Sequence, residues 1–232
     1  MSPTVTFHLW GVPVRGVPAA VLAMARERRP LRSAPGLRFA KLLGTGSGES
    51  FGLRDADVRH WAVLASWTSP EAARAFEGHP VVRRFDARSQ ERLRLTLEPL
   101  ASRGRWSGRE PFGDAGPPRT YAGPVAALTR ARVRPTRWRE FWRSVPAVSA
   151  DLAQAPGLLL RLGVGEAPVG LQGTVSLWRD ASDLTAFAYR RAPHAEVVRR
   201  TRERGWYAEE LFARFAVHEV EGTYRGSAPR GG

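Results

Sequence analysis

The chain has 232 residues, which is enough for one large domain or two small ones with a sizeable core. Hydrophobic residues make up 43% of it, which excludes a disordered chain. It contains no cysteine, so disulfides, iron–sulfur clusters, thiolate metal sites and cysteine nucleophiles are excluded. The net charge of +14 comes almost wholly from arginines spread along the chain. We interpret them as solvated helix faces and expect no nucleic-acid partner.

No apolar run approaches the roughly 18 to 20 residues that a membrane-spanning helix needs. Residues 1–10 alternate like a strand and lack the charged start of a signal peptide. We therefore expect a cytoplasmic protein.

Hydrophobic periodicity predicts the same six elements twice, in the same order. In the first half they are a strand at 4–10, a helix at 18–29, strands at 39–48 and 60–67, a helix capped by Ser69 and a strand at 93–97. In the second half they are a strand at 125–133, a helix at 136–153, strands at 158–165 and 173–178, a helix capped by Ser182 and a strand at 211–218. A Pro-Gly-Leu turn follows the first helix of each half, at 35–37 and 156–158.

Each half therefore reads β-α-β-β-α-β, the order of a ferredoxin-like unit with helices on one face of an antiparallel sheet. Burial of the two open sheet faces against each other predicts an α+β fold of tandem ferredoxin-like repeats, packed sheet to sheet as a pseudo-dimeric α/β barrel. Two independent units would leave apolar sheet faces exposed. The predicted parts are an N-terminal repeat at 1–108, a linker at 109–123, a C-terminal repeat at 124–226 and a flexible tail at 227–232.

The candidate metal ligands are the five histidines, which stand at positions 8, 60, 79, 194 and 218. No two have the spacing of a helical zinc site, and no local motif joins two of them to a carboxylate. His79 and His194 occupy similar places in the two halves, each next to a proline. A helical histidine facing an apolar cavity is what haem needs on its proximal side. A capping or core role is the alternative for both histidines.

Other motifs give less. The glycine-rich segment at 41–49 lacks the Walker ending and the dinucleotide-binding spacing, so it indicates a structural bend or an active-site loop. No GxSxG elbow surrounds a serine, which disfavours a triad hydrolase. Aromatic residues that repeat in both halves, such as Trp67 and Trp178, are typical of a core and not of base stacking.

Six segments in chain order carry a family resemblance. They are KLLGTGSGESF at 41–51, the strand at 60–67, RGRWSG at 103–108, PVAALTRARVRP at 124–135, FWRSVPAVS at 141–149 and the block at 193–215. Together they resemble the spheroidene monooxygenases, a family of bacterial carotenoid oxygenases. The resemblance covers nearly the whole chain.

This resemblance implies a haem-dependent monooxygenase that inserts oxygen into an acyclic carotenoid, and a relation to dimeric α/β-barrel proteins that bind haem through a helical histidine. It implies haem b, with its iron, as the cofactor, a small hydrophobic substrate, and an external electron donor such as ferredoxin or a reductase. Because the chain has no cysteine, such a haem would take a non-thiolate ligand.

The resemblance also assigns expected site residues. His194 is the expected iron ligand, with His79 in reserve. The expected cofactor-binding residues besides His194 are Arg161, Trp206 and Glu210, and the expected catalytic residues are Lys41 and Arg38. An arginine would pair with the haem propionates, Lys41 would line the distal side, and a glutamate such as Glu210 would hydrogen-bond the ring of His194.

Two other functions stay open. A related haem barrel can dehydrate aldoximes, or act on other N–O bonds, without an external reductant. A basic chain can also be a non-enzymatic binding module for an anionic partner. Peripheral contact with the inner face of a membrane is compatible with the sequence, as are a monomer with pseudo-twofold symmetry and a homodimer.

Overall fold

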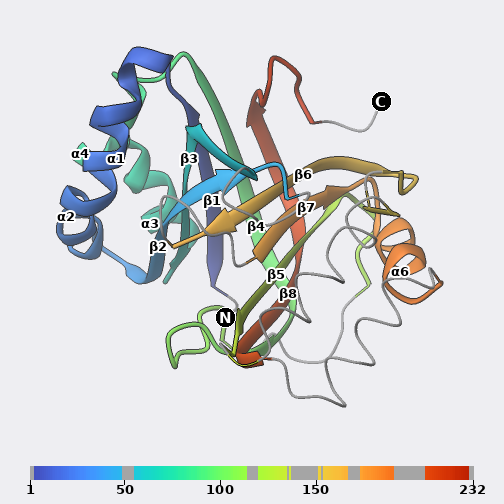
Figure 1. Cartoon of the computed structure of the whole chain (residues 1–232). Coiled ribbons are helices and arrows are strands. Elements are labelled where there is room, and N and C mark those ends of the chain that lie inside the picture. Colours follow the sequence, from blue (N-terminus) through green and yellow to red (C-terminus); the bar gives the residue numbers. More distant parts are fainter. Residues whose placement is uncertain are drawn as a thin grey trace.

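The computed structural model describes residues 3–48, 55–113, 120–134, 136, 151–152, 154–166, 173–190 and 207–229. Eight strands in these ranges form one closed antiparallel barrel in the order β1-β3-β2-β6-β7-β5-β8-β4 (Figure 1). The strands are β1 (Thr4–Gly11), β2 (Leu37–Gly46), β3 (Ala56–Trp67), β4 (Glu91–Gly104), β5 (Val125–Val133), β6 (Leu158–Gly165), β7 (Gly173–Trp178) and β8 (Tyr207–Gly222).

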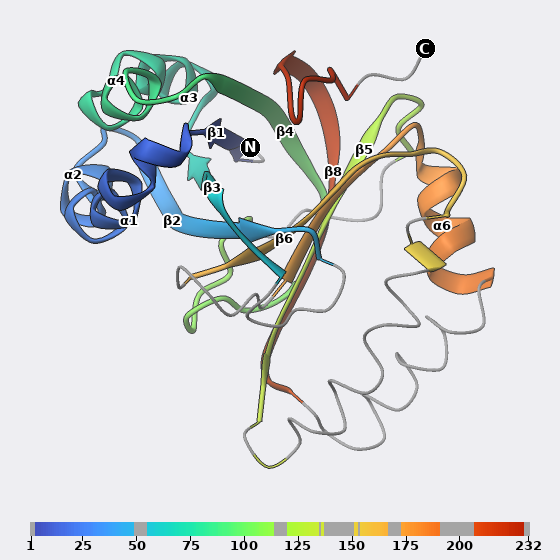
Figure 2. The same cartoon turned by 45° about the horizontal axis from the view of Figure 1, so that its top comes forward.

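The N-half, defined as β1–β4 with their helices, has the ferredoxin-like strand order β4-β1-β3-β2. Its helices are α1 (Val17–Arg26), α2 (Arg28–Arg32), α3 (Pro70–Ala75) and α4 (Pro80–Asp86), with 3₁₀ turns η1 (Val14–Gly16) and η3 (Phe76–Gly78). They lie together on the outer face of this sheet (Figures 1 and 2). The single helix predicted at 18–29 is divided at Glu27, whose buried carboxylate accepts hydrogen bonds from Arg84 of α4.

The C-half, defined as β5–β8 with α6 (Ala181–Arg190), repeats this order as β8-β5-β7-β6. The predicted bounds of β5, β6 and β7 are confirmed. The predicted strands at 93–97 and 211–218 lie within the longer β4 and β8. Most of the helix predicted at 136–153 lies outside the described residues.

One of the two predicted helix caps is wrong. Ser69 does cap α3, because its hydroxyl accepts a hydrogen bond from the backbone N–H of Ala72. In the C-half, however, the cap of α6 is Asp180, whose Oδ1 accepts from the backbone N–H groups of Ser182 at 2.8 Å and Asp183 at 2.9 Å. Aspartate and serine are similarly good caps, so the sequence alone did not separate Asp180 from Ser182.

The two halves share one core and two seams. All eight strands contribute apolar side chains to the barrel interior, among them Phe7, Leu64, Leu162 and Phe215. The predicted packing of sheet against sheet is therefore confirmed, and edge pairing completes it. β4 pairs with β8 from Leu93–Gly222 to Gly104–Leu211. β2 pairs with β6 only between 44–46 and 163–165.

Matching glycines end the long seam. Gly104 and Gly222, at the ends of β4 and β8, have φ angles of 97° and 85°. A Cβ on Gly104 would lie 2.2 Å from the carbonyl oxygen of Glu210, and one on Gly222 would lie 2.0 Å from that of Arg92. Only glycine fits this conformation and this close backbone approach.

The predicted repeat boundaries at 1–108 and 124–226 stay a prediction, and residues 114–119 of the expected linker are not among those described. Within the described ranges, no helix combines the length and the apolar character required to cross a bilayer.

Candidate functional site

The outer face of the N-half sheet is filled by large side chains. Trp10 of β1 and Trp61 and Trp67 of β3 all lie on it and are fully buried. Val63 and Leu42 pack in the same cluster against α1 to α4. This face has no space for a cofactor in the described part of the chain.

The outer face of the C-half sheet carries small side chains at the matching positions. Strand register gives the match, because Thr4 pairs with Trp67 in β1–β3 and Val125 pairs with Trp178 in β5–β7. Counted from these pairs, Thr6, His8 and Trp10 of β1 correspond to Ala127, Thr129 and Ala131 of β5. In the next strand, Ala65 and Val63 of β3 correspond to Ser176 and Thr174 of β7. We call these five C-half residues, with the neighbouring Arg161, Glu210 and Arg214, the C-half face.

Thr129 shows that the described residues leave this face uncovered. It lies near the centre of β5, paired with Thr174 of β7 and Phe212 of β8, yet it is exposed. Its N-half counterpart His8 is fully buried. Among the described residues, apolar packing covers one end of the C-half face, where Val125, Trp178 and Phe187 meet.

Three charged residues belong to the C-half face. Arg161 and Arg214 alternate with the interior residues Leu160, Leu162, Ala213 and Phe215, so their side chains leave the opposite side of the sheet. Both stand in one row, since Arg161 pairs with Ser176 and Arg214 with Ala127. The Nε of Arg214 is buried and has no hydrogen-bond partner among the described residues. Glu210 pairs with Ala131, on the same side of the sheet and further along β5 from the row that contains Ala127.

The structure therefore brings two predicted cofactor residues, Arg161 and Glu210, to one face. His194 and Trp206 lie outside the described residues. His79, the reserve ligand, lies in the N-half helical layer. Its Nδ1 accepts a hydrogen bond from the backbone N–H of Val81 at 3.3 Å and caps α4, and its ring stacks on Phe76. Burial lowers the pKa of His79.

Lys41 lies on the other side of the barrel wall. It alternates with Phe39 and Leu43, which both belong to the interior core. Its Nζ donates to Glu166 Oε2 at 2.6 Å and to Ser107 Oγ at 2.7 Å, and it lies 5.7 Å from the centroid of the Trp106 ring. Arg38 is an exposed residue of β2. Lys41 is thus separated from the C-half face by the sheet itself.

Sequence reasoning missed the partners of Lys41. Glu166 also accepts from the Nε1 of Trp106 at 2.6 Å and pairs with Arg130 at 3.2 Å. Burial raises the pKa of Glu166, but the hydrogen bonds from Lys41 and Trp106 outweigh this and lower it. Arg130 is buried and also pairs with Glu209. Arg130 has the same strand parity as the interior residues Ala126 and Leu128, and this parity could have predicted from the sequence that its side chain points into the barrel.

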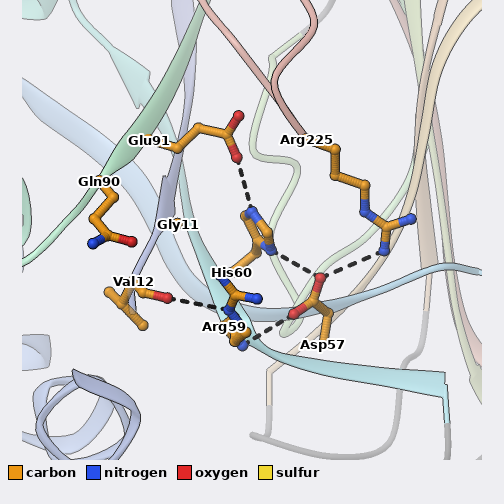
Figure 3. A pocket seen from close by; sticks show the side chains of 8 residues that line it. All are labelled: Gly11, Val12, Asp57, Arg59, His60, Gln90, Glu91 and Arg225. Atoms are coloured by element: carbon orange, nitrogen blue, oxygen red, sulfur yellow. Dashed lines mark hydrogen bonds and ion pairs between the residues drawn. The ribbon is translucent and has the colours of Figure 1, made fainter. Parts of the chain in front are cut away.

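A second polar cluster surrounds His60 beside a cavity of about 380 Å³ (Figure 3). The Nδ1 of His60 lies 2.8 Å from Asp57 Oδ2 and its Nε2 lies 3.1 Å from Glu91 Oε2, so the protonated ring donates to both carboxylates. Burial alone would lower the pKa of His60, but the two carboxylates outweigh it and raise this pKa. Burial would likewise raise the pKa of Asp57, but the bond to His60 dominates and lowers it to about 2.

When the ring of His60 is protonated, both of its nitrogens donate to carboxylates, and neither offers a lone pair to a metal or to a substrate proton. No three histidine, aspartate or glutamate side chains in the described ranges are arranged to hold a metal ion. We therefore assign the His60 cluster a structural role, and the C-half face is the candidate site.

The fold and this face define a pseudo-dimeric α/β-barrel protein in which one outer sheet face is filled by large side chains and the other is left uncovered by the residues that the structure describes. Among solved structures, an aldoxime dehydratase in complex with butyraldoxime has this fold, with a TM-score of 0.59 at 11% identity, covering 93% of this chain and 80% of that one. No protein-family model matches the sequence.

Sequence relatives go further than the fold. The chain is 37% identical to the spheroidene monooxygenase of Rhodobacter capsulatus over 219 residues, covering 92% of this chain and 89% of that protein. It is 32% identical to the spheroidene monooxygenase of Cereibacter sphaeroides over 210 residues, covering 90% of this chain and 64% of that protein. The chain belongs to the spheroidene monooxygenase family and is an enzyme of the oxidoreductase class.

Proposed function

We propose that the chain is a haem-dependent monooxygenase that oxidises a carotenoid, with haem b bound against the C-half face. The observation that carries the proposal is the contrast between the two outer sheet faces at matching positions. Tryptophans fill one face, whereas the other carries alanine and threonine, and in the described part of the chain these small side chains would leave room for a flat macrocycle. The family relationship supports the substrate class, because the relatives are spheroidene monooxygenases.

The residues of the C-half face fit such a group. Arg161 and Arg214 would pair with the two propionates, and the Nε of Arg214, which has no hydrogen-bond partner among the described residues, is suited to a carboxylate oxygen. Ala127, Ala131 and Thr174 would lie under the macrocycle. His194 remains the proposed iron ligand, and Glu210 the residue that orients it. When bound, the haem would supply oxygen activation with electrons from an external donor such as ferredoxin or a reductase.

An absorption spectrum tests the cofactor first. Purified protein, or protein reconstituted with haemin, should show a Soret band, and His194→Ala should lose it. His79→Ala is the matched control and should keep the band, since His79 lies in the filled half. A protein that takes up no haemin, or a band lost only in His79→Ala, would contradict the proposal.

Turnover separates the proposal from its runner-up. An aldoxime dehydratase shares the fold, and dehydration of an aldoxime is redox-neutral. The monooxygenase reading predicts a hydroxylated or ketonic carotenoid only when both O₂ and a reductant are supplied. Aldoxime conversion by reduced protein under anaerobic conditions, without carotenoid oxidation, would favour the runner-up. Absence of both, with salt-dependent binding to an anionic polymer, would favour a binding module.

A further inference from the structure

Helix α1 is apolar on its solvent side. Its sequence, VPAAVLAMAR, has no polar residue before Arg26. Only Ala20, Ala23 and Met24 are buried, and the remaining positions include the exposed Val21 (39%) and Leu22 (45%). Val14 of η1, immediately before it, is 72% exposed. A helix that is apolar on all sides is normally covered, but the residues that the structure describes leave Val21 and Leu22 of this helix exposed.

Exposed arginines flank these apolar side chains in the sequence. Residues 14–33 contain five, all exposed, which are Arg15, Arg26, Arg28, Arg29 and Arg32. The same stretch has one carboxylate, Glu27, which is buried and accepts hydrogen bonds from Arg84 at 2.7 and 2.5 Å. The solvent-facing side therefore carries cations without anions. We call the exposed residues of 14–32 the α1–α2 surface; α1 and α2 form one edge of the molecule (Figures 1 and 2).

We propose that the α1–α2 surface docks on an anionic lipid bilayer, with Val14, Val21 and Leu22 entering the boundary between headgroups and acyl chains. Exposed aliphatic side chains flanked by arginines are the combination that holds a helix at this interface. A second copy of the chain fits worse, because a twofold interface would place the five arginines against the same five arginines. The inference is independent of the cofactor.

Vesicle co-sedimentation of the full-length protein tests it. Binding should be strong to phosphatidylcholine–phosphatidylglycerol (3:1) vesicles, weak to pure phosphatidylcholine, and reduced by high salt. The double variant Arg28→Gln/Arg29→Gln should weaken partitioning on the order of fivefold for each arginine removed. Val21→Gln/Leu22→Gln should weaken it about tenfold, and glutamine keeps the helix.

The matched control is Arg105→Gln/Arg109→Gln, which removes two exposed arginines from the segment after β4, at the opposite end of Figure 1 from α1. It should bind like the wild type. The proposal would be overturned by an equal loss of binding in the control or by unchanged binding in both surface variants. It would also be overturned if the protein were a dimer that these variants dissociate. The assay reads no turnover or haem, so its failure is distinct from failure of the proposed function.

Discussion

Glu91 and Glu209 are counterparts in the two halves. Each carboxylate accepts hydrogen bonds from a short hairpin of the other half, which is 224–227 for Glu91 and 106–109 for Glu209. Glu91 accepts from the backbone N–H of Gly226 at 2.7 Å, and Glu209 from that of Gly108 at 2.8 Å. Both hairpins are two-residue turns with positive φ at both central positions. The pseudo-twofold therefore extends to the polar contacts that join the halves.

The cations beside these glutamates differ, because Glu209 pairs with Arg130 and Glu91 with His60. The side chain of Arg130 is only 5% exposed. Glu209→Gln should lower the free energy of unfolding by about 3 kcal/mol, because it removes the charge of one carboxylate that pairs with a buried cation. Urea denaturation measures this. Glu98→Gln, which affects the more exposed pair with His218, should cost under about 1 kcal/mol. Equal losses would contradict the assignment.

On the other side the cation is His60, which titrates. Its pKa is raised in the folded state, because the bonds to Asp57 and Glu91 outweigh burial. Folding therefore favours the protonated ring, and this stabilisation is fully present below the unfolded pKa of about 6.5 and is lost as pH rises through the folded pKa. His60→Gln should remove this decline from the curve of unfolding free energy against pH. His218→Gln, at an exposed site, serves as control; an unchanged curve in His60→Gln would refute the prediction.

A tryptophan like those on the outer face of the N-half sheet should fill the C-half face. Thr129→Trp should reduce haem bound per chain by more than about tenfold, because the indole would occupy the space assigned to the macrocycle. Thermal unfolding of the apoprotein should be little changed, since Thr129 is exposed. Arg132→Trp, an exposed site on the same strand but out of step with Thr129, is the control. Full haem content in Thr129→Trp would place the cofactor elsewhere.

Lys41 joins the halves by its contact with Glu166, which follows β6, and it also donates to Ser107 of its own half. Lys41→Met should cost about 1–2 kcal/mol of unfolding free energy and leave haem content unchanged. Arg38→Met, at an exposed residue, should cost under about 0.5 kcal/mol. Loss of turnover in Lys41→Met with haem content and stability intact would instead support the catalytic role that the family resemblance implies.

Much of the fold could be predicted from the sequence because the repeat makes each half a check on the other. β5, β6 and β7 have the predicted bounds since apolar alternation defines them. β4 and the C-terminal end of β8 extend beyond the predicted bounds because they pair with each other across the halves, and periodicity within one strand cannot report that. The break of the first helix at Glu27 depends on a salt bridge to Arg84, far away in sequence.

The candidate site was only partly predictable. Arg161 and Glu210 lie on the face that strand parity gives them. The contrast of Trp10 with Ala131 was available in the aligned repeats and marks the half with room. The cluster of Lys41, Glu166 and Arg130 was not predictable, because barrel closure brings together β2, β5 and the end of β6.

The unequal seams have a consequence for breathing of the native state. β2 and β6 are held together over only 44–46 and 163–165, where four of the six residues are glycine, while β4 and β8 pair along most of their length. Local opening should start at the short seam, so backbone amides there should exchange with deuterium sooner than those of β4. The two halves would then separate along the β2–β6 seam while the β4–β8 pairing still holds them together. This opening would expose the apolar interior of the barrel without global unfolding.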